Sequence, residues 1–368
     1  MKIDKVELFG IRLPLHEPFI VSYDKYDDMP AILVKIELEN GVVGWGEAVP
    51  DQHVTGETWH SALQVLEHEL APLLSGLSPF QIELIHQKMN KKILGNPSAK
   101  AAIDCALYDL MGKITEQPVY QLIGGKTHDF LVMPQVISIK SPDEMASDAR
   151  RMVREGFRNL KIKVGTDMET DIERIRAVRN AIPPEVKLRV DANQGWDRTS
   201  AITVIDQTKD CLVEWYEQPV LADDILSLQE IRKVSPAKIM IDEGIHSTHD
   251  LLNVIKTRSA DMVNIKLMKA GGIYPSLAIA NMAEAAGLPC QVGSMVESAV
   301  GTMAGAHLAI SRDIIQSNEL VGPFMISKDI GKVSFEGDVL KFPELPGLGV
   351  VVDESLVKEL SEVHIIIS

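Results

Sequence analysis

Long apolar runs are missing from this sequence of 368 residues. No stretch approaches the roughly 18 uninterrupted apolar residues that suggest a membrane span, so we expect no membrane partner. The first five residues, Met1–Lys5, alternate charged and apolar side chains and lack the apolar core of a secretory signal. This pattern predicts a cytoplasmic protein.

Cysteine is also scarce: the chain has three, Cys105, Cys211 and Cys290. They lie far apart in the sequence, and none has a second cysteine or a histidine at metal-ligand spacing. We therefore expect buried thiols without a chemical role.

Basic residues are fewer than acidic ones, with 37 Lys and Arg against 52 Asp and Glu, which gives a formal net charge of −15. This balance argues against nucleic acid or an anionic membrane surface as a partner. A small-molecule site remains open, because local charge can oppose the net charge.

The sequence divides into two regions with different patterns of apolar residues, followed by a short C-terminal segment. Residues 1–125 begin with strand-like alternation, turned at Asn40-Gly41, and continue with helical periodicity from about residue 58 to 114, which predicts a small α+β capping domain. Residues 126–327 alternate short apolar strands with helical segments and are predicted to form the catalytic barrel. From residue 328 to 368, strand-like runs at 331–335 and 349–352 are expected to return to the capping domain.

The strands expected in residues 126–327 end at a nearly constant interval. Their ends follow one another by 24 to 28 residues and fall near Val136, Lys163, Asp191, Glu217, Asp242, Lys266, Gly293 and Glu319. Such spacing indicates a parallel barrel or a long open sheet. No dinucleotide glycine fingerprint follows any strand, which weakens the doubly wound alternative. The predicted fold class is α/β: a modified (β/α)₈ TIM-like barrel of the form (β/α)₇β, with the capping domain.

Ionisable side chains stand at the ends of five successive strands, where barrel enzymes build their sites. Asp191, Glu217 and Asp242 end the adjacent third, fourth and fifth strands, and three oxygen ligands without a nearby His or Cys suit Mg²⁺ better than zinc. Lys163 on the second strand and Lys266 on the sixth are four apart in a ring of eight. The two amines should therefore face each other across a substrate.

This arrangement suits proton abstraction next to a carboxylate. A divalent cation can stabilise the negative charge that develops there, and a lysine base must be neutral near pH 7, which requires a lowered pKa. We expect the positive charges of the metal and of Lys161 to lower the pKa of Lys163. With Lys266 opposite, one amine can remove the proton and the other can replace it with inversion.

Together these residues resemble the muconate-lactonizing subgroup of the enolase superfamily, over essentially the whole chain. The matching segments are GWGEA at 44–48, KIK at 161–163, DAN at 191–193, EQP at 217–219, DE at 242–243, NIK at 264–266, GG at 271–272, GSMVE at 293–297 and PGLG at 346–349. No histidine ends the seventh strand, where the mandelate racemase subgroup carries its second base. The sequence is thus more similar to the two-lysine subgroup.

The resemblance implies a role for each matching residue. Lys163 and Lys266 would be the acid/base pair, and Lys161 would contact the substrate carboxylate. The metal ligands would be Asp191, Glu217 and Asp242, holding one Mg²⁺ per subunit, with Mn²⁺ as a possible substitute. Asn193, on the substrate side, and Glu243 would lie near the metal in supporting roles. Family resemblance also implies a homo-oligomer.

The substrate class is narrowed by one stretch after the eighth strand. Dipeptide epimerases carry Asp-x-Asp there to hold a free ammonium group, whereas this chain has Glu319 and Val321. An N-acylated amine loses nothing by that change, which favours an N-acylamino acid racemase similar to the N-succinylamino acid racemases. Dipeptide epimerase, o-succinylbenzoate synthase and muconate cycloisomerase remain alternatives. A barrel used only for binding is the non-enzyme alternative.

Two segments of the capping domain are expected to contact the rest of the substrate. Residues 23–30 form an acidic, aromatic-containing loop, and residues 51–57 form a second loop that could close over the barrel mouth. One or more of Asp24, Asp27, Asp28 and Asp51 could face a cationic side chain, with Asp27 and Asp51 as the named candidates, which predicts a preference for N-succinyl-arginine or N-succinyl-lysine. Further candidate substrate contacts are Ser294, Glu297 and Glu319, although the first two could instead begin a helix.

Overall fold

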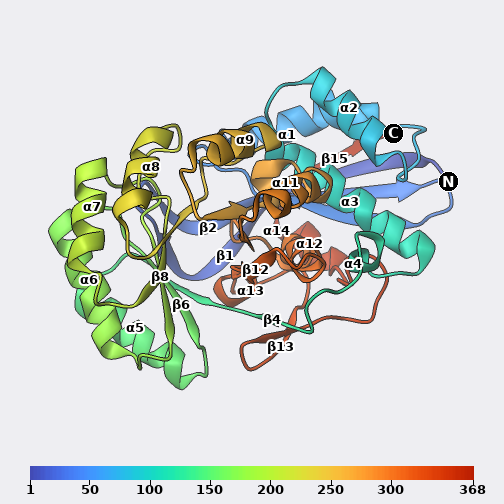
Figure 1. Cartoon of the computed structure of the whole chain (residues 1–368). Coiled ribbons are helices and arrows are strands. Elements are labelled where there is room, and N and C mark those ends of the chain that lie inside the picture. Colours follow the sequence, from blue (N-terminus) through green and yellow to red (C-terminus); the bar gives the residue numbers. More distant parts are fainter.

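The computed structural model describes residues 1–368. Its N-terminal part holds a four-stranded antiparallel sheet in the order β15-β1-β2-β3, as the alternating patterns predict. The strands are β1 (Ile3–Ile20), β2 (Lys25–Leu38), β3 (Val43–Ala48) and β15 (Ser361–Ile367). Both chain termini lie beside this sheet (Figure 1).

Helices α1 (Trp59–Val65) and α3 (Pro97–Thr115) pack against this sheet. The other helical elements of this part are a π-helical turn (Leu66–Leu70), a 3₁₀ turn (Ala71–Leu73), α2 (Ile82–Lys92) and the short α4 (Val119–Leu122). Strand β3 and helix α3 approach each other closely, since a Cβ atom on Gly46 would lie 1.9 Å from the carbonyl oxygen of Ala102. A side chain at position 46 would therefore push the helix off the sheet.

An eight-stranded parallel sheet, with neighbours in chain order, makes up the second part. Its elements are β5 (Gln135–Ile137), α5 (Pro142–Arg154), β6 (Asn159–Lys163), α6 (Met168–Ala181), β7 (Lys187–Asp191), α7 (Arg198–Gln207), β8 (Val213–Glu217), α8 (Ile225–Val234), β9 (Lys238–Ile241), α9 (Thr248–Thr257), β10 (Met262–Ile265), α10 (Leu267–Ala270), α11 (Ile273–Ala286), β11 (Cys290–Val292), α12 (Ala299–Ile310) and β12 (Ile315–Asn318). The strand order never reverses, so the sheet has no topological switch point of the doubly wound kind. The predicted (β/α)₇β barrel is confirmed.

The two outer strands of the curled sheet come together through β4 (Leu131–Val132), which immediately precedes β5. Asn318 of β12 donates its side-chain N–H to the carbonyl oxygen of Val132, at 3.0 Å. The core runs without a break from the barrel strands into the surrounding helices and the capping sheet. All three cysteines are buried free thiols, as expected.

The C-terminal segment returns to the N-terminal sheet, where Val6 of β1 pairs with Ile367 of β15. Before it come α13 (Gly322–Met325), β13 (Ser334–Glu336), β14 (Val339–Lys341) and α14 (Glu354–Leu360), and β14 pairs with both β13 and β4. The strand predicted at residues 349–352 was wrong. That segment is irregular and partly exposed because no strand lies beside it to accept its backbone hydrogen bonds.

No helix in the structure is both long and apolar enough to cross a membrane.

Candidate active site

A narrow cavity of about 40 Å³ lies where the capping domain meets the C-terminal ends of the barrel strands. The capping domain contributes Phe19, Val21, Tyr23, Tyr26, Met29 and Asp51 to its wall, and the barrel contributes Val136, Lys163, Asn193, Lys266, Ser294, Met295, Val296, Glu319 and Val321. Small-molecule sites usually measure about 300–1,000 Å³. A substrate can therefore enter only if the residues from the capping domain move.

Three carboxylates converge beneath this cavity. Asp191 ends β7 and is the register partner of Glu217, which ends β8, while Asp242 follows β9 two residues beyond Met240, the register partner of Glu217. One oxygen from each lies within 4.8 Å of the others, and all three side chains are fully buried. Glu217 Oε2 and Asp242 Oδ2 face only lysine amines, at 2.9 and 2.8 Å, outside hydrogen-bond geometry. Three buried carboxylates clustered this tightly fit a divalent cation such as Mg²⁺.

Lysines surround the triad of carboxylates and balance much of its negative charge. Lys163 Nζ lies 2.7 Å from Asp191 Oδ2, and Lys266 Nζ lies 2.8 Å from Asp242 Oδ2. Burial opposes ionisation of Asp191, but the neighbouring lysines outweigh burial and hold its pKa below its ordinary value. Glu217 has less compensation, and burial together with the charge of Asp191 raises its pKa to about 8.

The two predicted acid/base lysines both reach the cavity, from strands four positions apart in the barrel. Burial lowers the pKa of Lys266, but the Asp242 carboxylate outweighs this effect, and the net pKa is raised. Asp242 therefore favours the charged form of Lys266. A cation that bound Asp242 would weaken this pairing and allow the amine to become neutral.

Lys161 lies deeper in the barrel than the two acid/base lysines. It precedes Lys163 by two residues on β6, which places it roughly 7 Å further into the barrel, beyond the cavity wall. Its Nζ lies 2.9 Å from both Asp191 Oδ2 and Glu217 Oε2 and contacts Glu319. None of these contacts has the angles of a hydrogen bond, so Lys161 compensates the carboxylates through its charge.

Asn193 and Glu243 lie beside the triad, as the resemblance implied. The backbone N–H of Asn193 donates to Asp191 Oδ1 at 2.9 Å, and its side chain donates to Glu243 Oε1 at 3.1 Å. Asn193 adopts a left-handed backbone conformation, with φ of 41°, which turns the chain so that both contacts are possible. Ser22 of the capping domain donates to the Asn193 carbonyl oxygen at 2.7 Å and joins the two parts.

Of the predicted substrate contacts, Asp51, Ser294 and Glu319 line the cavity. Glu297 is buried behind it and accepts a hydrogen bond from the backbone N–H of Met295 at 2.9 Å. Asp27 lies away from the cavity, because its segment is part of strand β2 rather than a loop. Its side chain is 71% exposed and pairs with Lys25.

Sequence reasoning missed two residues that support the triad. Lys269 Nζ lies 2.5 Å from Asp242 Oδ1, and Asn264 donates to Glu217 Oε1 at 2.8 Å. A signal for Lys269 was present, because it follows Lys266 by three residues and one turn of helix would place the two amines close together. Asn264 belongs to the matching segment at residues 264–266, but the resemblance implied no role for it.

A third missed residue, Glu47, joins the capping domain to the barrel. Its carboxylate accepts hydrogen bonds from the backbone N–H groups of Ser298 and Gly301, at 2.9 and 2.8 Å. These groups belong to the first turn of α12. These hydrogen bonds fix β3 against the start of that helix, and burial raises the pKa of Glu47 to about 8.

The fold and the site define an enolase-type barrel enzyme: a capping domain over a parallel barrel, a buried carboxylate triad, and lysines on opposed strands. Residues 4–124 match the family described as mandelate racemase / muconate lactonizing enzyme, N-terminal domain, and residues 144–356 match the family described as enolase C-terminal domain-like. The chain belongs to this mandelate racemase / muconate lactonizing enzyme family and is an isomerase of the enolase superfamily.

Individual relatives are similar over almost the whole chain. An N-succinyl-L-Arg/Lys racemase from Bacillus cereus is 47% identical over 98% of both chains, and an L-Ala-D/L-Glu epimerase from Bacillus subtilis is 40% identical over 95% of this chain and 97% of its own. The crystal structure of the Bacillus cereus racemase superposes with a TM-score of 0.99, at 46% identity and with full coverage of both chains. A dipeptide epimerase from Enterococcus faecalis, solved with Mg and a dipeptide, superposes with a TM-score of 0.92, at 38% identity over 95% of this chain and 99% of its own.

Proposed function

We propose that this protein is a Mg²⁺-dependent racemase of N-succinylated amino acids with a preference for arginine and lysine side chains. The observation that carries the proposal is the placement of Lys163 and Lys266, whose amines reach one cavity from opposite sides of the barrel. One amine removes the α-proton from one face of the substrate, and the other returns a proton to the opposite face. The product is the mirror-image amino acid derivative.

The metal would be held by Asp191, Glu217 and Asp242, and we propose one ion per subunit, with Mn²⁺ as a substitute. When bound, Mg²⁺ supplies a Lewis acid that stabilises the negative charge developing on the substrate carboxylate. The chain's own residues do the rest: Lys161 balances the triad from below, and Asn193 and Glu243 orient Asp191. The capping domain excludes water from the cavity.

An acylated amine is favoured by the surroundings of Glu319. One oxygen of its carboxylate contacts Lys161, and Val321 beside it is apolar, so Glu319 is the one carboxylate in this part of the wall and is already paired with a lysine. A free ammonium buried there without a partner costs several kcal/mol, roughly. The amide of an N-succinyl group carries no such charge.

A cationic substrate side chain is favoured by Asp51 in the wall from the capping domain. Its Oδ1 accepts from the backbone N–H groups of His53 and Val54, at 2.7 and 3.0 Å, and its Oδ2 accepts from the hydroxyl of Tyr26. A carboxylate has about four acceptor positions, so one remains for a guanidinium or ammonium group. The similarity to an N-succinyl-L-Arg/Lys racemase supports the same preference.

The test is polarimetry with Mg²⁺ on N-succinyl-L-arginine, N-succinyl-L-lysine, N-succinyl-L-phenylalanine and L-Ala-L-Glu. We expect racemisation of the first two, abolished by Lys163→Ala and retained in the exposed-lysine control Lys209→Ala. Turnover of the dipeptide alone would replace this substrate class by that of the dipeptide epimerases. A new aromatic absorbance would indicate o-succinylbenzoate synthase. Unexchanged α-hydrogens in D₂O would indicate a barrel that only binds. Cytoplasmic location and homo-oligomeric assembly stay predictions.

A further inference from the structure

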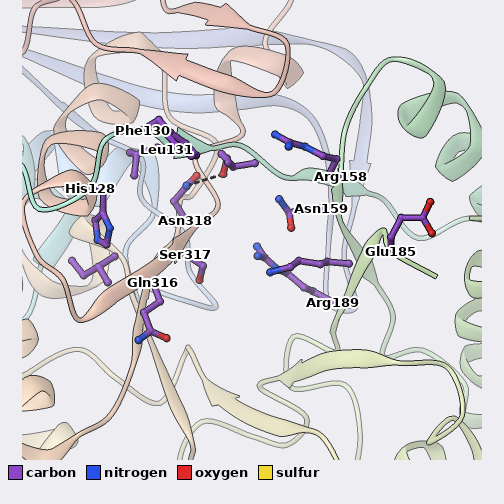
Figure 2. A pocket seen from close by; sticks show the side chains of 13 residues that line it. His128, Phe130, Leu131, Arg158, Asn159, Glu185, Arg189, Gln316, Ser317 and Asn318 are labelled. Carbon is purple, nitrogen blue, oxygen red and sulfur yellow. Dashed lines mark hydrogen bonds between the residues drawn. The ribbon is translucent and has the colours of Figure 1, made fainter. Parts of the chain in front are cut away.

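A second and larger cavity, of about 430 Å³, lies at the opposite end of the barrel (Figure 2). Its wall comes from the segment around residues 128–132 and from the N-terminal ends of three strands, which begin at Asn159 (β6), Lys187 (β7) and Ile315 (β12). The triad member Asp191 ends β7, four residues after Lys187, so the two ends of that strand are roughly 13 Å apart. The cavity is therefore separate from the candidate active site.

Arg189 is the central side chain of this cavity. It is 7% exposed, its Nε donates to Glu214 Oε2 at 3.2 Å, and its guanidinium lies over the ring of Trp215, 4.2 Å from the centroid. Its two terminal nitrogens make no hydrogen bond with the protein and point into the cavity together with Asn159 (Figure 2). Guanidinium donors that face a cavity and are not used by the protein can bind an acceptor that enters from outside.

The charges around the cavity are balanced in number but unevenly placed. Arg158 is paired with Asp338 at 2.7 and 2.8 Å, whereas Lys187 and Arg189 share the single carboxylate of Glu214. Glu185 also lines the cavity and forms no ion pair. The donors that remain unused are therefore those of Arg189.

Neutral polar groups complete the wall. The side chain of Asn159 makes no hydrogen bond, the buried Oδ1 of Asn318 has no donor, and Ser317 lies across the cavity from Asn159 (Figure 2). They can bind hydroxyl, amide or further oxyanion groups of a ligand. The volume is within the usual range of about 300–1,000 Å³ for small-molecule sites.

We propose that this cavity is a second ligand site that binds a small molecule bearing an oxyanion, either carboxylate or phosphate, through the terminal nitrogens of Arg189. The planar fork of the guanidinium accepts both groups in a two-point contact. Asn159 and Ser317 contact the remainder of the ligand. The proposal is independent of the reaction at the other end of the barrel.

The test is isothermal titration of the full-length protein with inorganic phosphate and, separately, with succinate, each at millimolar concentration. We expect one of the two anions to bind. Binding of phosphate would indicate a phosphate-bearing ligand, and binding of succinate would indicate a carboxylate-bearing ligand. Arg189→Gln should weaken binding about tenfold or more. Asn159→Leu, which replaces the amide in the cavity wall with an apolar side chain and leaves the Arg189–Glu214 contact in place, should do the same while racemase activity is retained.

Anions could also bind at the catalytic end, so Lys161→Met is the control. Binding that survives Lys161→Met and is lost in Asn159→Leu supports the proposal, even if Arg189→Gln fails to fold. Binding that persists in Asn159→Leu, or that is lost in Lys161→Met alone, would overturn it. So would the absence of binding by both anions.

Discussion

Lys269 Nζ and Asp242 Oδ1 lie 2.5 Å apart, and the same amine donates to the backbone carbonyl oxygen of Asn264 at 3.0 Å. Lys266 Nζ pairs with the other carboxylate oxygen of Asp242, at 2.8 Å. Asp242 is thus held by a lysine on each oxygen. One of these amines faces the cavity, and the other is buried behind it.

This relationship predicts that Lys269 positions the metal site without touching the substrate. Lys269→Met should reduce metal affinity or turnover by about 10–100-fold, because residues that orient metal ligands typically have effects of that size. The measurement is kcat as a function of Mg²⁺ concentration. Lys233→Met, an exposed lysine on α8, is the control. Unchanged kcat and unchanged half-saturating Mg²⁺ in Lys269→Met would contradict the assignment.

The two-lysine mechanism predicts opposite defects in two variants. Lys163→Ala should stop α-proton exchange with one enantiomer, and Lys266→Ala should stop it with the other, because each amine faces one side of the substrate. Racemisation should fall by about 10²–10⁴-fold or more in both. Proton NMR in D₂O, run separately on each enantiomer, measures the exchange. If one variant loses exchange with both enantiomers and the other keeps both, a single base operates.

Removal of divalent metal should inactivate the enzyme and lower its stability. We expect EDTA to abolish racemisation and Mg²⁺ or Mn²⁺ to restore it. At about 100 times the dissociation constant, bound metal adds about 2.7 kcal/mol to the free energy of unfolding. Thermal unfolding with and without Mg²⁺ gives a readout that does not depend on activity. The shift in Tm should disappear in Glu217→Gln, and a shift that persists there would place the ion elsewhere.

Specificity for a cationic side chain should depend on Asp51. Asp51→Asn is expected to lower kcat/KM for N-succinyl-arginine about tenfold relative to N-succinyl-phenylalanine, since a charged hydrogen bond is lost. Asp27→Asn is a matched control in the same domain, because Asp27 is exposed and paired with Lys25. Equal effects of Asp51→Asn on the two substrates would remove Asp51 from substrate recognition.

Stability below neutral pH should depend on His307. Its Nδ1 accepts from the Tyr120 backbone N–H and its Nε2 faces the Leu348 carbonyl oxygen, both at 3.2 Å, an arrangement that requires the neutral ring. Burial lowers the pKa of His307 from 6.5 to about 4. Between these values the unfolded chain binds more protons than the folded one, so stability is lost as the pH falls.

The loss from His307 should reach about 3 kcal/mol between pH 6.5 and pH 4. Denaturant unfolding across this range measures it, as the difference in pH dependence between the wild type and His307→Gln. The exposed His60→Gln is the control. A wild type and a His307→Gln variant with parallel pH profiles would contradict the assignment.

Much of the site followed from strand periodicity. Because side chains alternate along a strand, Lys163, Asp191 and Glu217 had to share the inner face near the strand ends, and the structure places them there. Periodicity gave the face of Lys161 but not its depth. Two residues below the rim, Lys161 is a buried partner of the carboxylates, and its contact with the substrate carboxylate stays a prediction.

Predictions for the capping domain were weaker because loops carry no period. Asp27 and Asp51 were equivalent in the sequence, and only their neighbours separate them: Asp27 lies on a paired strand facing solvent, and Asp51 faces the barrel. The strand predicted at residues 349–352 failed for a related reason. Its composition suits a strand, but no neighbouring backbone completes the ladder.

The sequence by itself determined the barrel, the charged residues at the strand ends and the return of the chain to its first sheet, since each depends on local periodicity and regular spacing. Only the tertiary structure decided which of those charges meet. Three residues lie beside partners that are distant in the chain: Lys269 behind Asp242, Glu47 at the start of α12, and Arg189 at the far end of the barrel. Contacts of that kind arise from packing between elements, which no local pattern encodes.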